Sequence, residues 1–589
     1  SIETETSLNG SNIRSLVQAS AEEGSPVCKI VYSGEMDQKG WLAVSLRPCN
    51  PEGVSFIHHI SLDDSRKLWT VNEKATVKMS EAPEICAMSE YHGGDAALEL
   101  KNPENKEKIK CSVGMATSAA LFRIEPGKEK NVTITIPLEG RRNEESGSEQ
   151  YVFQSWKGSL EHLCHLDIPD KRICELFNIA LYSLILHSPG DVYPGPYTYK
   201  RFWFRDAAFI LQAMLCAGMK TRSRRALEKF PSRQNPWGYF HSQDGEWDSN
   251  GEALWIMNRY CELTGEAPPE KWLSSIRKGG KWIERKRVSD AKKAPHAGLF
   301  PAGFSAEHLG SNDFYYWDDF WGVAGLKSAA NMLKLAGDEK TATEFISEAD
   351  DFMKAIEKSL ENLVHPSPGN AMPTSPYRRM DSGAIGSIVA GYPLQIMKPD
   401  DPRLIDTVDY LMQHSMIQGG FFQDMIHSGI NAYLTLHIAQ VLLRAGDPRF
   451  YDLLEVVTDI ASPTGQWPEA VHVRTKGGCM GDGQHIWAAA EWVMMIRNCF
   501  IREEPEQNKI VLCSGVHRSW RKKNEPLSFG PAPTFCGPIT VFAEPKEKEI
   551  LVRWEADWRD DPPAMEIALS GLPRKKVNPE DGYVTVRSE

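Results

Sequence analysis

Three short stretches of the sequence combine tryptophan with charged side chains. They are Trp-Phe-Arg-Asp at 203–206, Trp-Asp-Asp at 317–319 and Trp-Pro-Glu at 467–469, each beside an apolar run of helical character. An indole ring can stack on the C–H face of a sugar, while carboxylates exchange protons and bind hydroxyls. The combination predicts a site that holds a sugar ring and cleaves its glycosidic bond.

Two carboxylates are candidates for the chemistry itself. Inverting cleavage needs a protonated carboxyl for the leaving oxygen and an ionised one that activates water, roughly 6.5–9.5 Å apart. Asp318 suits the acid, because the aromatic run 314–321 excludes water and Asp319 adds a like charge. Glu469 follows a Trp-Pro turn and suits the base. The structural alternatives are that an Asp caps a helix starting at Phe320, or that Glu469 is an exposed loop residue.

Other side chains near these motifs are candidates to hold the sugar. Arg205 and Asp206 stand at the start of an apolar helical run, and a guanidinium beside a carboxylate can bind two vicinal hydroxyls. A structural ion pair explains this dipeptide equally well. The remaining candidates are aromatic and polar side chains from the same motifs or close to them: Trp203, Trp317, Asp319, Trp467, Gln243, Asp244 and His485.

Composition restricts the class of partner. The net charge of -12 and the pI near 5.8 argue against nucleic acid and suit a neutral carbohydrate substrate. No apolar run reaches the roughly 18 to 20 residues of a membrane span, so no membrane partner is expected. Twelve scattered cysteines without a Cys-x-x-Cys pair, and a polar start to the chain, predict a cytoplasmic protein. The dispersed histidines predict no metal and no cofactor. No pattern indicates an oligomeric state.

Three domains are expected from the change of period along the chain. Short β-branched runs such as 29–32, 41–46 and 132–136 predict an N-terminal antiparallel β-sandwich with its linker over residues 1–150. About a dozen amphipathic helices without βαβ alternation follow over 151–505 and predict stacked helical hairpins. Strand-like runs return in a small C-terminal β domain, 506–589.

The order of the motifs resembles glycoside hydrolase family 15, the glucoamylases and related bacterial α-glucosidases. Matching stretches are 203–209, 248–255, 317–319, 468–469 and 486–491, within about residues 199–497. The resemblance implies an (α/α)6 barrel behind a β-sandwich and an inverting attack on α-glucosides. It implies that Arg205, Asp206 and Asp319 hold the sugar, with Asp318 as general acid and Glu469 as general base.

One departure concerns the acid. Glucoamylases carry Trp-Glu-Glu where this chain has Trp-Asp-Asp, and the shorter side chain moves the proton donor by about one methylene. An Asp acid with a Glu base is similar to trehalases and glycoside hydrolase family 63, which also invert on this barrel. We expect an exo-acting hydrolase of an α-linked glucoside or related oligosaccharide. The alternatives are a phosphorylase on the same barrel and a non-catalytic carbohydrate-binding protein.

Overall fold

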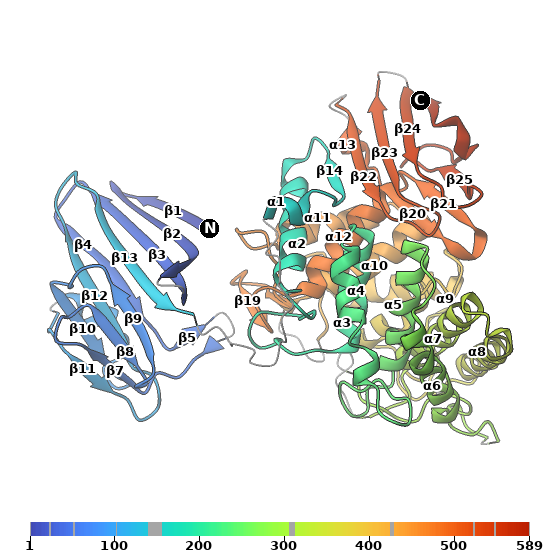
Figure 1. Cartoon of the computed structure of the whole chain (residues 1–589), viewed down its shortest axis with the longest axis horizontal. Helices are drawn as coiled ribbons and strands as arrows, with labels where there is room; N and C mark the ends of the chain where they lie inside the picture. Colours follow the sequence, from blue (N-terminus) through green and yellow to red (C-terminus); the bar gives the residue numbers. More distant parts are fainter. Residues whose placement is uncertain are drawn as a thin grey trace. The chain divides into compact units, whose positions relative to one another are not determined.

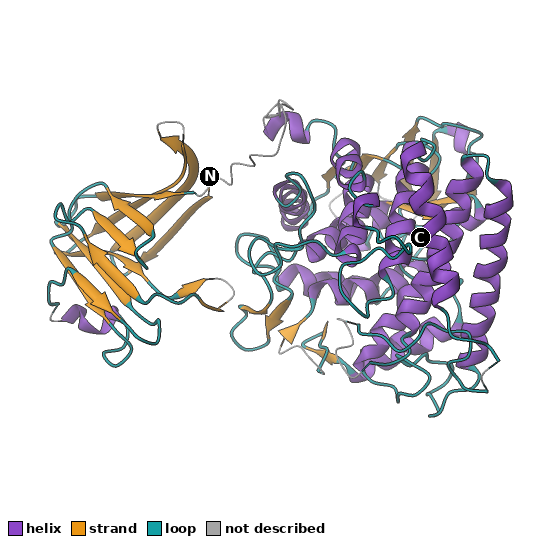
Figure 2. Ribbon diagram, turned by 60° about the horizontal axis from the view of Figure 1, so that its bottom comes forward, coloured by secondary structure: helices purple, strands orange, loops and turns teal. Residues whose placement is uncertain are grey.

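The computed structural model describes residues 2–22, 25–50, 53–101, 103–138, 156–291, 293–305, 312–424, 429–521, 525–546 and 549–587. The chain forms two compact units, Ser1–Phe153 and Gln154–Glu589. In Figure 1 the first unit is coloured from dark blue to cyan and the second from teal to red. Strands dominate the first unit and helices the second (Figure 2).

Besides the short antiparallel pair of β5 (Cys49–Asn50) and β6 (Gly53–Val54), the first unit contains two larger antiparallel sheets. One has the strand order β1-β2-β3-β13-β9-β8-β7-β11, and the other has the order β10-β12-β4. Both contribute to one apolar core, with Val132 of β13 and Trp69 of β8 from the first sheet and Phe122 of β12 from the second. The bounds are β1 Ile2–Leu8, β2 Ser11–Glu22, β3 Ser25–Met36, β4 Gly40–Leu46, β7 His59–Leu62, β8 Leu68–Val71, β9 Ala75–Met79, β10 Ile85–Ser89, β11 Lys108–Lys110, β12 Thr117–Ile124 and β13 Lys130–Pro137.

An inner set of helical segments forms the centre of the second unit. Each contacts the next in the order α3, α5, α7, η4, α10 and α12, and α12 contacts α3 again. These segments are apolar nearly all round, as expected for helices enclosed by other helices. Their bounds are α3 Phe204–Cys216, α5 Ser249–Thr264, α7 Tyr316–Leu335, η4 Ser382–Ala390, α10 Ala432–Ala445 and α12 Ile486–Phe500.

Outer helices pack on this inner set with one apolar face each. The helix α6 is representative, because it buries Trp272, Ile276 and Ile283 while its lysines and arginines lie on the other face. Contacts connect α2 with α12, α4 with α3 and α5, α6 and α8 with α7, α9 with η4, and α11 with α10. The bounds are α2 Lys171–Leu186, α4 Lys220–Leu227, α6 Glu270–Lys286, α8 Glu339–Leu360, α9 Pro402–His414 and α11 Phe450–Asp459.

The second unit has two small sheets, β15-β16 and β17-β18-β19, with the bounds β15 Met416–Ile417, β16 Gly420–Phe421, β17 Gly429–Ile430, β18 Ala470–His472 and β19 Gly478–Met480. Two larger sheets lie near the C-terminus marked in Figure 1. Their strand orders are β14-β22-β23-β24-β27 and β20-β21-β25-β26. Apolar side chains of these strands, such as Val541 and Ile510, belong to the same buried cluster as the helices. The bounds are β14 His165–Asp167, β20 Ile501–Glu504, β21 Lys509–Leu512, β22 Leu527–Ala532, β23 Ile539–Pro545, β24 Glu549–Ala556, β25 Ala564–Ile567, β26 Lys575–Val577 and β27 Tyr583–Arg587.

Candidate active site

A cavity of about 180 Å³ lies where the N-terminal ends of the inner helices meet. Arg205 and Asp206 come from the first turn of α3, Trp487 from that of α12, and Glu469 from the loop before it. Helix N-termini favour negative groups, which suits the carboxylates gathered there. The lining residues are Pro194, Tyr199, Trp203, Arg205, Asp206, Gln243, Glu246, Phe304, Tyr433, Glu469, His485 and Trp487.

Hydrogen bonds to backbone carbonyls fix the turn that carries Glu469. The side-chain amide of Asn431 donates to its carbonyl oxygen at 3.1 Å, and the backbone N–H of His485 donates to the carbonyl of Trp467 at 2.7 Å. The indole of Trp467 in turn donates to the carbonyl of Val457 at 2.8 Å. The glutamate that was expected to be the base therefore lies on a fixed turn whose side chain faces the cavity.

The hydroxyl of Tyr199 donates a hydrogen bond to Oε2 of the Glu469 carboxylate at 2.5 Å. Burial raises the pKa of Glu469 to about 7, the Tyr199 hydrogen bond lowers it, and the charge of Asp482 raises it. Asp482 is fully buried and accepts the backbone N–H groups of Thr198 and Tyr199 at 3.0 and 2.9 Å. It thereby positions the tyrosine that contacts the candidate base.

A second group of carboxylates surrounds Arg205. The guanidinium lies 2.7 Å from Asp248, 3.4 Å from Glu246 and 3.8 Å from Glu252, and all of these side chains are buried. Asp318, in the first turn of α7, is 1% exposed, and neither of its carboxyl oxygens has a hydrogen-bond partner among the described residues. One guanidinium cannot neutralise this many carboxylates. The protonated form of some of these carboxyl groups is therefore favoured.

The pKa shifts in this group follow from burial. Burial raises the pKa of Asp318 well above its ordinary value, the charges of Asp248 and Asp319 raise it further, and Arg205 lowers it. Burial also raises the pKa of Glu246, against the effect of Arg205. Both carboxyls are therefore suited to be proton donors at neutral pH. Glu246 lines the cavity, whereas Asp318 is not among its lining residues in the described part of the chain.

Of the expected sugar contacts, Trp203, Arg205, Asp206, Gln243 and His485 line the cavity. The aromatic rings meet at their edges, with Tyr199 5.9 Å from Trp203 and 6.1 Å from His485 between ring centroids. The guanidinium of Arg201 lies over one face of the Trp203 ring, 3.9 Å from its centroid. This part of the site combines aromatic and hydrogen-bonding surfaces, as a pyranose ring requires.

The other expected contacts lie elsewhere in the described structure. The indole of Trp317 is buried and donates to Asp248 at 2.8 Å, and Trp467 packs against Trp492 with a centroid distance of 5.3 Å. Asp319 is buried, accepts the backbone N–H of Phe300 at 2.8 Å, and has its pKa raised by burial to about 8. Asp244 is exposed and lies 2.9 Å from His241. A sugar contact for these four remains a prediction.

Six cavity residues were not predicted: Pro194, Tyr199, Glu246, Phe304, Tyr433 and Trp487. Trp487 and Tyr433 each follow the first residue of an apolar helix. Their sequence pattern is therefore that of core residues. Glu246 precedes the Trp-Asp-Ser-Asn-Gly stretch, and the clue was its place directly before a helix that carries a further buried acid, Glu252.

Two other features concern cofactors and membranes. The described residues include no group of three or more His, Cys, Asp or Glu side chains arranged to hold a metal ion. Within the same part of the chain, no helix combines the length and apolar character needed to span a bilayer. 

Comparison with known proteins gives the fold. No family model matches the sequence, and no curated protein matches it. A bacterial glucoamylase complexed with acarbose is similar in structure, with a TM-score of 0.59 and 12% identity over 83% of this chain and 82% of that one. A GH78 rhamnosidase of Bacillus sp. GL1 has a TM-score of 0.51 and 13% identity over 94% of this chain and 54% of its own.

A third similar structure is the α-L-rhamnosidase from Dictyoglumus thermophilum. Its TM-score is 0.50 at 12% identity, over 98% of this chain and 63% of that chain. The chain thus covers 54% of the length of the Bacillus rhamnosidase and 63% of the length of the Dictyoglumus one. The three likenesses place the chain in the six-hairpin glycosidase-like fold.

Proposed function

We propose that this protein is an inverting, exo-acting glycoside hydrolase of an α-linked glucoside or related oligosaccharide. The observation that carries the proposal is the cavity in which Glu469 and Glu246 face a guanidinium, a carboxylate and aromatic rings. Glycosidic cleavage with inversion uses two carboxyl groups, one protonated and one ionised. The resemblance of the ordered motifs to family 15, and the shared fold, support the same reaction.

Glu469 is the general base in this proposal. Its pKa of about 7 is close to neutral pH, where a base combines sufficient ionisation with sufficient proton affinity. Its fixed turn and the Tyr199 hydrogen bond orient Oε1 and Oε2 relative to a water molecule in the cavity. That water attacks the anomeric carbon, and Glu469 removes its proton.

Asp318 is the general acid, as its place in the order of motifs implies. Its carboxyl is buried beside Asp248 and Asp319 and has a strongly raised pKa, so it carries a proton at neutral pH. Hydrogen bonds of catalytic groups are often incomplete before substrate binds, so a carboxyl behind the cavity wall can still be the donor. Glu246, on the wall itself, is the rival donor, and variants of the two separate them.

The architecture supports the proposal in two ways. The closed order of contacts among α3, α5, α7, η4, α10 and α12, with outer helices around it, is what an (α/α)6 barrel requires, and the two larger sheets of the first unit fit a β-sandwich. The cavity of about 180 Å³ is smaller than the roughly 300–1,000 Å³ typical of drug-sized ligands. A cavity of this size suits one terminal sugar ring and therefore exo attack.

Hydrolysis of a panel of α-linked disaccharides tests the proposal. Maltose, isomaltose, kojibiose and trehalose are incubated with wild type and Glu469→Gln, with and without inorganic phosphate. We expect phosphate-independent release of a monosaccharide that Glu469→Gln abolishes. Turnover that requires phosphate would establish the phosphorylase, although a carboxylate such as Glu469 repels that anion. Sugar binding without turnover would establish the binding protein.

A further inference from the structure

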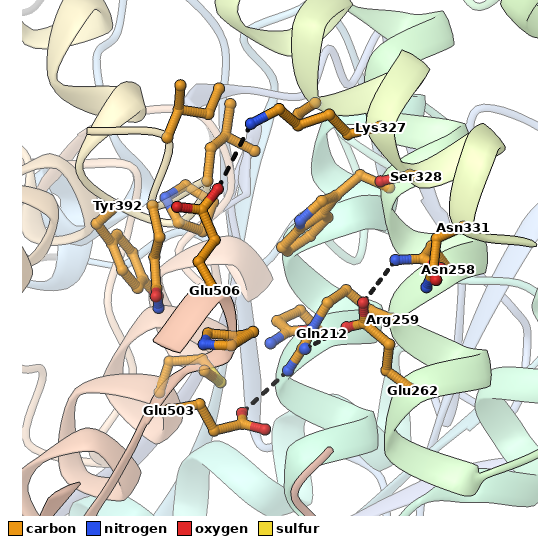
Figure 3. A pocket seen from close by; sticks show the side chains of 18 of the residues that line it. Gln212, Asn258, Arg259, Glu262, Lys327, Ser328, Asn331, Tyr392, Glu503 and Glu506 are labelled. Carbon is orange, nitrogen blue, oxygen red and sulfur yellow. Dashed lines mark hydrogen bonds and ion pairs between the residues drawn. The ribbon is translucent and has the colours of Figure 1, made fainter. Parts of the chain in front are cut away.

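A second cavity, of about 350 Å³, lies toward the opposite ends of the same inner helices (Figure 3). On α3 it is lined by Gln212 and on α12 by Met494, each seven residues after a residue that lines the candidate active site, Arg205 and Trp487 respectively. At 1.5 Å per residue these positions are roughly 10 Å apart along the helix axis. The second cavity is therefore distinct from the candidate active site.

The walls of the second cavity carry many hydrogen-bonding groups and no net charge. Three cationic residues, Arg259, Lys327 and Arg497, are balanced by the carboxylates of Glu262, Glu503 and Glu506. The buried charges are paired, with Arg259 3.0 Å and Arg497 2.8 Å from Glu503. A charged ligand would find no uncompensated partner there.

Carboxamides supply most of the remaining polar surface. They come from several elements, and one pair is hydrogen-bonded, with Asn331 donating to Asn258 at 2.8 Å. A carboxamide both donates and accepts, which matches a hydroxyl group better than it matches an ion. The carboxamides that line the cavity are Gln212, Asn258, Asn331, Gln395 and Asn498.

Two buried polar atoms on the wall lack a hydrogen-bond partner among the described residues. They are Gln395 Oε1, an acceptor, and Arg497 Nε, a donor. Buried polar atoms nearly always have a partner, so each of these calls for a ligand or an ordered water. Gln395 also has a left-handed backbone, with φ of 54°, which is uncommon for a residue other than glycine and often marks a functional site.

Apolar surface completes the wall. The indole of Trp255 is 7% exposed, and Ala324 and Met494 lie beside the same space. At the rim, Lys327 lies 3.4 Å from Glu506, and both side chains are substantially exposed (Figure 3). The volume falls within the roughly 300–1,000 Å³ of small-molecule sites.

We propose that this second cavity is a binding site for a small, neutral polyhydroxy compound, such as a monosaccharide or cyclitol. This site does not depend on the proposed hydrolysis. The carboxamides bind the hydroxyl groups of the ligand, and the indole of Trp255 contacts its apolar face. Gln395 Oε1 and Arg497 Nε then form hydrogen bonds to the ligand. Two inner helices, α3 and α12, contribute residues to both cavities, so a ligand in the second cavity contacts helices that also line the candidate active site.

Isothermal titration calorimetry of the full chain tests this site with myo-inositol and D-glucose as probes, and inorganic phosphate as a charged probe. Ala324→Leu places a larger side chain in the cavity, and Ala336→Leu is the matched control, because Ala336 is exposed on the same helix. We expect polyol binding in wild type and Ala336→Leu, at least tenfold weaker binding in Ala324→Leu, and no binding of phosphate.

Two further variants keep the test decisive. Gln395→Ala removes one unpaired acceptor from a loop and is expected to weaken polyol binding even if Ala324→Leu does not fold. Trp203→Ala alters only the active-site cavity and is expected to leave binding of myo-inositol unchanged. Binding lost in Trp203→Ala but retained in Ala324→Leu and Gln395→Ala would overturn the proposal, as would the absence of polyol binding, which would indicate water alone. Disaccharide hydrolysis by each variant separately reports on the active site.

Discussion

The hydroxyl of Tyr199 donates a hydrogen bond of 2.5 Å to Oε2 of Glu469. This bond stabilises the ionised carboxylate and opposes the increase in pKa caused by burial. The tyrosine itself is held by Asp482, which accepts its backbone N–H. The proton affinity of the candidate base thus depends on a residue that the sequence motifs do not include.

Replacement of Tyr199 by Phe tests that dependence. Hydrogen bonds to charged groups contribute roughly 1.5–3 kcal/mol, or roughly one to two pKa units. Because the ionised form of Glu469 is the active one, its loss of stabilisation raises the pKa from about 7. We expect the acid limb of the kcat/KM profile to move to higher pH by about one unit. Tyr197→Phe, on the same loop and exposed, is the control; an unshifted limb in Tyr199→Phe would contradict the base assignment.

Gly481 packs directly against the candidate base. A Cβ at this position would lie 2.6 Å from Glu469 Oε2 and 2.6 Å from Tyr199 Cε2, and its φ of +62° also favours glycine. We expect Gly481→Ala to lower kcat about 10-fold to 100-fold while the protein remains folded, because a small displacement of a catalytic group is costly. Gly477→Ala, in the turn before the short strand Gly478–Met480, where a Cβ would meet only Thr475 Oγ1 at 3.8 Å, should retain wild-type kcat. Equal kcat in both variants would argue against a catalytic Glu469.

Part of this account could be predicted from the sequence. Hydrophobic periodicity predicted most of the inner helices. Helical segments were expected at 252–264, 341–360, 432–444 and 484–497, and α5, α8, α10 and α12 end within a few residues of these positions. The start of α7 was misplaced: it begins at Tyr316, not Phe320, because buried Tyr316 and Trp317 extend the helix and no side chain caps it. Asp318 therefore lies in the first turn and does not cap a helix.

The composition of the cavity was harder to predict than the helices. Arg205 and Glu469 stand in recognisable motifs, but Glu246 and Tyr199 reach the same cavity only through the packing of distant loops. Among the outer helices, the short α11 was not singled out in the sequence, whereas the basic runs 222–225 and 285–287 were expected to be solvated helix faces and lie on α4 and at the end of α6. The boundary expected at 505/506 remains a prediction, and the strands beyond it share a core with the helices.

The identity of the proton donor can be decided by two isosteric variants. Asp318→Asn and Glu246→Gln each remove one acidic proton from the Arg205 group. If Asp318 is the donor, its variant lowers kcat on a disaccharide by roughly 10²–10⁴-fold, and much less on an aryl glucoside with a good leaving group. Glu246→Gln should then show a smaller loss and no such dependence on the leaving group. The reverse pattern would assign the donor to Glu246.

Asp319 makes folding stability depend on pH. Its pKa rises from 3.8 in the unfolded chain to about 8 in the folded one, because it is buried. Between these values the folded state holds a proton that the unfolded state has released, so this contribution to stability is present at low pH and is lost as pH rises toward 8. Asp319→Asn should reduce the decrease in melting temperature between pH 5 and pH 8.

A suitable control for this measurement is Asp244→Asn, because Asp244 is fully exposed. That variant should retain the wild-type pH dependence of the melting temperature. An unchanged slope in Asp319→Asn would mean that Asp319 is ionised in the folded protein, where its charge would raise the pKa of the neighbouring Asp318 further.

The central claim is that Glu469 activates water for an inverting attack. Proton NMR of the first product formed from the cleaved α-linked disaccharide tests it most directly, with wild type beside Glu469→Gln and Asp318→Asn. We predict that the β-anomer appears first and that both variants abolish or strongly reduce it. Initial release of the α-anomer, or unchanged release of the β-anomer by Glu469→Gln, would contradict the account.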